Sequence, residues 1–122
     1  ITSKLGDEHF MRGDYNAALQ WYEQTRAKNL RAHLMTGHTY DKLGNLQGAR
    51  NAYEAAAERY GEDYVQPYVN LARIAAVSGN TADADAYFQK VKKKLAGMTA
   101  LQRQKIRQSS DYTRMRDALG MD

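Results

Sequence analysis

The stretch GNLQGARNAY (residues 44–53) decides the fold of this chain, because it occurs in variant form at two further places. The first copy spans residues 13–22 and the third spans residues 79–88. Each copy begins with Gly and a small polar residue, and it carries Ala five positions and an aromatic residue nine positions after that Gly. The three leading glycines are 31 and 35 residues apart. Self-similarity at a period of about 20–50 residues is typical of proteins built from stacked repeats.

The residues between these glycines predict an all-α chain. Ala, Leu, Gln, Lys, Arg and Glu dominate, and the apolar residues recur at helical spacing. Each leading Gly is expected to end one helix, and the polar residue after it (Asp14, Asn45, and Asn80 or Thr81) is expected to cap the next. The faces predicted to be buried are Ala18, Leu19, Tyr22 and Thr25; Ala49, Ala52, Tyr53 and Ala56; and Ala84, Tyr87, Phe88 and Val91.

This pattern predicts three antiparallel helix pairs, in units of about residues 1–29, 30–61 and 63–96. Pro67 is compatible with the first turn of a helix. Thr99 and Gln102 form a capping-box pattern that starts a seventh helix over about residues 99–119. Ser109, Ser110 and Asp111 form the stretch where this helix would break or restart. A chain of 122 residues is expected to form one domain, residues 1–122.

The bulk composition excludes some kinds of site. Cys is absent, which excludes disulfides and thiolate metal sites within these residues. No apolar run reaches the roughly 18–20 residues that a membrane-spanning helix needs. The chain starts at Ile1 rather than Met, so we expect a piece of a longer protein. The compartment stays open, and the cytoplasm and the bacterial cell envelope are both compatible with a soluble segment.

The repeat resembles the tetratricopeptide repeat, a helix-turn-helix unit of about 34 residues. The resemblance covers about residues 1–96. Its small residue in the first helix is matched at Gly6, Gly37 and Ala72; its early Ala in the second helix at Ala18, Ala49 and Ala84; and its following aromatic residue at Tyr22, Tyr53 and Phe88. The family also has an aromatic residue at one further position of the first helix. Tyr40 fits this position in the second unit, whereas His9 and Ala75 stand there in the first and third units. The usual closing Pro is missing from all three.

The resemblance implies a right-handed α-solenoid whose first helices line a concave groove that binds a peptide or a helix of another protein. By position, the groove residues are Asp7, Phe10, Arg31, Leu34, Met35, His38, Asp41, Gln66, Val69, Asn70 and Arg73. The alternative is that Phe10, Leu34 and Met35 pack between repeats. The terminal helix resembles the solvating cap of such arrays.

Some members of the family clamp a carboxylate with Lys, Asn and Arg in their first helices. Only Asn70 and Arg73 match that set here. Asp7 would repel a carboxylate, so we do not expect the clamp in this chain.

No pattern indicates catalysis, a metal or a cofactor. His9 and His33 stand at aromatic core positions of the family, whereas His38 is expected to face the groove. No His pair has the spacing of a helical zinc site, and the Gly44–Gly48 stretch lacks the Lys and Ser/Thr of a phosphate loop. We therefore expect a non-catalytic scaffold that takes part in assembling a larger complex and binds no cofactor.

The net charge of +4 is concentrated near the end of the chain. Residues 1–89 carry a net charge of −2, and residues 90–122 carry +6. The basic patch consists of Lys90, Lys92, Lys93, Lys94, Arg103, Lys105 and Arg107. Nucleic acid is a weaker expectation for its ligand than an acidic protein or an anionic membrane surface, because only Tyr112 could stack on bases. Self-association of the repeat array is a further alternative.

Overall fold

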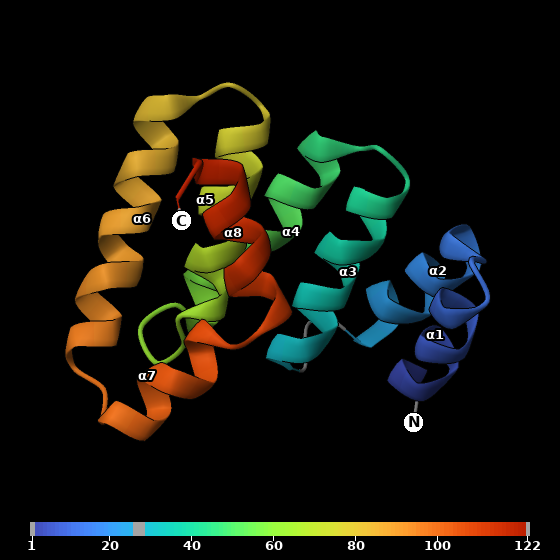
Figure 1. Ribbon diagram of the computed structural model, residues 1–122. Coiled ribbons are helices and arrows are strands. Elements are labelled where there is room, and N and C mark those ends of the chain that lie inside the picture. The colour runs from blue at the N-terminus through green and yellow to red at the C-terminus, as the bar shows by residue number, and fades with distance from the viewer. Residues whose placement is uncertain (1, 26–28, 122) are drawn as a thin grey trace. The chain divides into compact units, whose positions relative to one another are not determined.

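The computed structural model describes residues 2–25 and 29–121, and within them it is all-helical. The elements in chain order are α1 (Thr2–Met11), α2 (Tyr15–Thr25), α3 (Leu30–Lys42), α4 (Leu46–Tyr60), α5 (Gln66–Val77), α6 (Thr81–Ala96), α7 (Ala100–Arg107) and α8 (Ser110–Leu119). The helices α5 and α6 run back and forth as a hairpin, as Figure 1 shows. The predicted end of the first unit, residues 26–28, lies outside the described residues.

The chain divides into two compact units, Ile1–Glu58 and Arg59–Asp122. In the first unit α2 packs against both α1 and α3. The helices of each pair approach closely because a Gly of the first helix meets a Tyr ring of the second. A Cβ added to Gly6 would lie 2.7 Å from Tyr22 Cε1, and one added to Gly37 would lie 2.3 Å from Tyr53 Cε1. Both Tyr residues are fully buried.

The three glycine turns predicted from the repeat are confirmed. Gly13, Gly44 and Gly79 have φ angles of +83°, +78° and +80°, a left-handed conformation that residues with a Cβ rarely adopt. The expected caps follow two of them. Asn45 Oδ1 accepts a hydrogen bond from the Gly48 amide at 2.9 Å, and Asn80 Oδ1 accepts one from the Asp83 amide at 3.1 Å. Each turn therefore ends one helix and starts the next.

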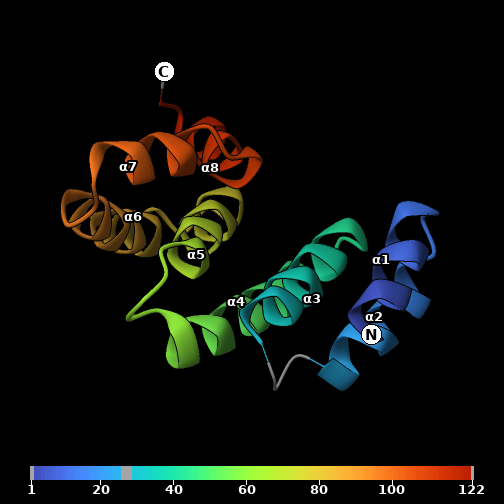
Figure 2. The ribbon, with the colours of Figure 1, turned by 90° about the horizontal axis from the view of Figure 1, so that it is seen from below.

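In the second unit α5 packs against both α6 and α8. The three helices share a core of buried side chains: Val65, Val69, Ala72, Val91, Leu95, Tyr112 and Met115. Figure 2 shows α7 and α8 as a layer over α6 and α5. Met115 is fully buried, so α8 is a structural part of this unit.

The terminal helix expected over residues 99–119 is divided into α7 and α8, and the division lies within the stretch where a break or restart was expected. Ser109 ends α7 and starts α8, because its hydroxyl donates to the Ile106 carbonyl at 2.6 Å and accepts from the Tyr112 amide at 3.2 Å. Ser side chains compete in this way with a continuing helix. The capping box at Thr99 and Gln102 is confirmed, and it starts α7. Pro67 lies in the first turn of α5, as predicted.

Candidate functional site

Two of the predicted groove residues in the first unit are paired with each other. Arg31 Nη2 of α3 lies 2.9 Å from Asp7 Oδ2 of α1. The other oxygen of Asp7 accepts a short hydrogen bond from the Tyr22 hydroxyl of α2. Three helices are thus joined at one carboxylate. The side chains of Arg31 and Asp7 are 55% and 36% exposed, so the pair is accessible to a ligand.

Tyr22 is held in its neutral form by this arrangement. Burial of the hydroxyl is the largest cause that raises its pKa well above the ordinary value. The hydrogen bond to Asp7 and the negative charge of that carboxylate raise the pKa further, whereas the positive charge of Arg31 lowers it. A hydroxyl that stays protonated remains a donor to Asp7 at all physiological pH values.

The second helix pair repeats this arrangement with a different partner for the Tyr hydroxyl. The Tyr53 hydroxyl lies 2.7 Å from His38 Nδ1, and the two rings meet edge to face. His38 directly follows Gly37 in the chain, as Asp7 follows Gly6. In both pairs a polar atom of the predicted groove residue is therefore hydrogen-bonded to the buried Tyr, which limits the orientations that its side chain can adopt.

The other predicted groove residues of the first unit are half-buried. Leu34, Met35 and Asp41 of α3 are all of this intermediate class. Phe10 of α1 packs edge-on against the Tyr15 ring, with 5.2 Å between the ring centroids. These side chains combine apolar and charged groups, as a surface for an amphipathic peptide would require.

Three predicted groove residues of α5 are buried. Val69 is 2% exposed and belongs to the core shared with α8, and Asn70 is fully buried. The Asn70 amide donates to the Gln66 carbonyl at 3.0 Å and to Asp111 Oδ2 of α8 at 3.2 Å. Arg73 is 4% exposed. The chain itself thus supplies the carboxylate that meets Asn70.

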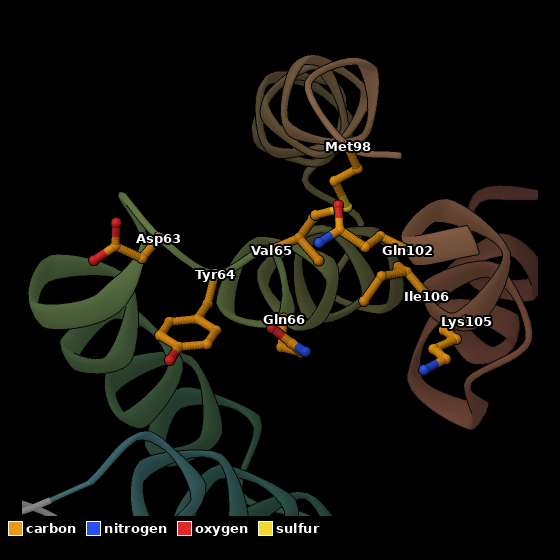
Figure 3. Close-up of a pocket in the computed structure, with 8 residues that line it drawn as sticks. All are labelled: Asp63, Tyr64, Val65, Gln66, Met98, Gln102, Lys105 and Ile106. Atoms are coloured by element: carbon orange, nitrogen blue, oxygen red, sulfur yellow. The ribbon is translucent and has the colours of Figure 1, made fainter. Parts of the chain in front are cut away.

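Gln66, the remaining predicted groove residue, lines a cavity of about 380 Å³ at the start of α5. Met98, Gln102 and Ile106 converge there on Val65 (Figure 3). Gln66 Oε1 is buried without a hydrogen-bond partner among the described residues. Asp63, Tyr64 and Lys105 complete the lining, and Lys105 is a member of the predicted basic patch. The walls are mostly apolar and carry charges of both signs.

Three lysines of the basic patch lie beside aromatic rings. Lys90 and Lys94 hold their ammonium groups 5.5 and 5.8 Å from the centre of the Tyr68 ring. Lys92 lies 5.2 Å from the centre of the Phe88 ring. The described part of the chain therefore places two aromatic rings beside lysines of the patch that sequence reasoning did not assign to it. One signal was present, because Phe88 precedes Lys92 by four residues on one helix.

The predicted core role of His33 agrees with its 4% exposure. The side chain of His9 is 29% exposed, and its Nδ1 lies 3.7 Å from the Asp14 carboxylate. Across residues 2–25 and 29–121, no three His, Asp or Glu side chains are grouped closely enough to hold a metal ion.

Comparison with known proteins identifies the repeat. Of the helices that the structure describes, none is long and apolar enough to cross a membrane. No curated protein matches the chain. The family model of the tetratricopeptide repeat matches residues 30–63, which contain α3, α4 and the Gly44 turn. This repeat is typical of modules for protein–protein interaction and is in general not catalytic. The all-helical chain is therefore similar to the tetratricopeptide repeat over residues 30–63, which are called the matched repeat below.

Proposed function

We propose that this protein is a non-catalytic scaffold that binds a peptide or a helix of a partner protein on the surface formed by α1 and α3. In this proposal three helix pairs, closed by α7 and α8, form one superhelical domain with the first helices on its concave side. Binding of this kind would recruit the partner into a larger complex.

The observation that carries the proposal is the recurrence of one packing unit in register. Gly6 with Tyr22 and Gly37 with Tyr53 bring two helix pairs to the same close approach. In each pair the residue after the Gly meets the Tyr hydroxyl. A repeated frame with variable residues at the same position is how repeat proteins combine a common fold with different ligands.

The exposed ion pair and the apolar residues beside it indicate the chemistry of the partner. Arg31 and Asp7 could form hydrogen bonds with polar groups of a peptide, while Leu34 and Met35 offer apolar area. Buried apolar contacts supply most of the affinity at such surfaces, and charged groups at the rim contribute mainly to specificity.

The test is a double substitution on α3, Leu34→Glu with His38→Glu, in pull-down and titration with a partner isolated on the unmodified protein. The carboxylate of His38→Glu offers an acceptor to the Tyr53 hydroxyl, as Asp7 does to that of Tyr22, so helicity should persist. The matched control is Gln47→Glu with Asn51→Glu, which adds two charges at the same spacing on exposed positions of α4. We expect loss of binding in the first variant alone, and full binding by that variant would refute the assignment.

A further inference from the structure

A second surface, built from helices other than α1 and α3, is a cleft of about 400 Å³ formed by α6, α7 and α8. We call it the cationic cleft and define it by the apolar residues Phe88, Leu95 and Tyr112 and the cations Lys92, Arg103 and Arg107. All of them belong to the second compact unit. Its volume is within the range of about 300–1,000 Å³ that is usual for ligand sites.

The apolar part of the cleft is preformed. Leu95 and Tyr112 are 3% and 7% exposed and belong to the core of the unit, and Phe88 packs against that core. Side chains held by a packed core keep their rotamers, so a ligand would not have to order them. The cleft therefore offers a rigid apolar floor to an incoming side chain.

The cations of the cleft are held beside this floor. The Lys92 ammonium lies 5.2 Å from the centre of the Phe88 ring. Arg103 Nη1 donates to the Leu95 carbonyl at 3.2 Å and to the Met98 carbonyl, which fixes the guanidinium at the end of α6. A guanidinium has five N–H donors, so others remain for a ligand. None of the described lining residues carries a carboxylate, so the charged side chains among them are all cations.

The combination favours an acidic peptide over a nucleic acid. Single-stranded nucleic acids bind by stacking bases on open aromatic faces. Tyr112 is only 7% exposed, and Lys92 lies over the Phe88 ring. An apolar side chain can use the same rings by edge contact, and carboxylates on either side of it can pair with the cations.

We propose that the cationic cleft binds an acidic peptide segment of a partner protein. An apolar side chain of that segment enters between Phe88, Leu95 and Tyr112, and flanking carboxylates pair with Lys92, Arg103 and Arg107. This site is independent of the surface on α1 and α3, and it can bind its ligand whether or not that surface binds another.

The experiment is a titration of the whole chain with the fluorescein-labelled peptide GEDLFEDG, followed by anisotropy and by NMR shifts of the backbone amides. The amide form GQNLFQNG and the apolar-deleted form GEDSSEDG serve as peptide controls. We expect saturable binding with shifts at Lys92, Arg103 and Arg107, and affinity reduced at least about tenfold for either control peptide. Absence of saturable binding at millimolar peptide would overturn the proposal.

Charge variants decide whether the cleft is the site. Lys92→Glu with Arg107→Glu should weaken binding at least about tenfold, because charge pairs beside an apolar floor are partly desolvated. Lys93→Glu with Lys105→Glu reverses the same number of charges on exposed positions of the same two helices, and it should weaken binding by about twofold. Lys92→Gln with Arg107→Gln repeats the test without adding negative charge.

Two results would contradict the assignment. Equal losses in the Lys92/Arg107 and Lys93/Lys105 variants would mean that only general positive charge attracts the peptide. Tighter binding of an oligothymidylate, with the same NMR shifts, would assign the cleft to nucleic acid. The Leu34→Glu/His38→Glu variant should bind the acidic peptide normally, which separates this site from the proposed function on α3.

Discussion

Gly37 of α3 lies directly against the ring of Tyr53 of α4, so closely that an added Cβ would come within 2.3 Å of Cε1. Glycine in the middle of a helix costs about 0.5–1 kcal/mol relative to Ala. The close approach compensates for this cost, because it allows a fully buried Tyr to fill the space between the two helices. The contact lies within residues 30–63, the matched repeat.

Gly37→Ala should destabilise the protein by about 1–2 kcal/mol. Overpacking costs typically about 1–3 kcal/mol, and the gain in helix propensity offsets part of it. The control is Gly97→Ala, where the added Cβ would make an ordinary contact of 3.7 Å, and we expect a change within about 0.5 kcal/mol. Urea denaturation measures both, and equal midpoints for the two variants would contradict the packing argument.

Tyr22→Phe should destabilise the protein at neutral pH by about 1 kcal/mol, because Asp7 loses its bond from the hydroxyl. The pKa of Tyr22 is raised in the folded state, so its stabilising contribution is complete below the unfolded-state pKa of about 10. Above that pH the contribution falls by up to about 1.4 kcal/mol per pH unit. Tyr22→Phe has no hydroxyl to ionise and does not lose stability in this way. The difference in unfolding free energy between the unmodified protein and the variant should therefore shrink as the pH rises from 10.

Urea titrations between neutral pH and pH 11 would measure this convergence. Tyr64→Phe serves as the control for removing one tyrosine hydroxyl, since Tyr64 is 47% exposed. A deficit of Tyr22→Phe that stays constant over this range would show that the hydroxyl ionises alike in the folded and unfolded states.

Asp111→Ala should destabilise the second unit by about 1–3 kcal/mol. It removes an acceptor from the amide of Asn70, which is fully buried. Asp111→Asn keeps an acceptor of the same shape and should lose less. Asp117→Ala removes an exposed carboxylate from the same helix and should change the stability by at most about 0.5 kcal/mol. Thermal unfolding followed by circular dichroism ranks the three, and a loss in Asp117→Ala as large as in Asp111→Ala would contradict the assignment.

Asn80→Ala should cost about 1 kcal/mol, because it deletes the side-chain acceptor of the Asp83 amide at the start of α6. Asn80→Ser keeps a capping oxygen and should recover most of that loss. Hydrogen exchange at the first amides of α6 is the measurement, and unchanged exchange in Asn80→Ala would show that the cap adds nothing to the first turn.

The sequence predicted the local structure well where the type of one residue determines the backbone conformation or the packing. A Gly at positive φ follows α1, α3 and α5, and the end of α3 follows from Gly44. The buried residues Ala49, Ala52 and Ala56 follow from helical periodicity and the requirement for small residues between close helices.

Contacts between elements that are distant in the chain could not be predicted in this way. Periodicity identifies the apolar face of a helix but not the element that covers it. Asn70 and Asp111 are 41 residues apart, so the packing of α8 on α5 left no local signal. The same limit applies to Asp7 and Arg31, which sequence position placed on one surface without pairing them.

The glycine turns also make this chain convenient to label. Apart from each glycine and its two chain neighbours, no described heavy atom lies within 4 Å of the position where a Cβ would project from Gly13, Gly44 or Gly79, so each turn is open on its outer side. The residues that precede them, Arg12, Leu43 and Ser78, are all exposed. Because the chain contains no Cys, one Cys introduced beside a turn would be its only thiol. A dye or spin label attached there could report on partner binding without entering the contacts between the helices.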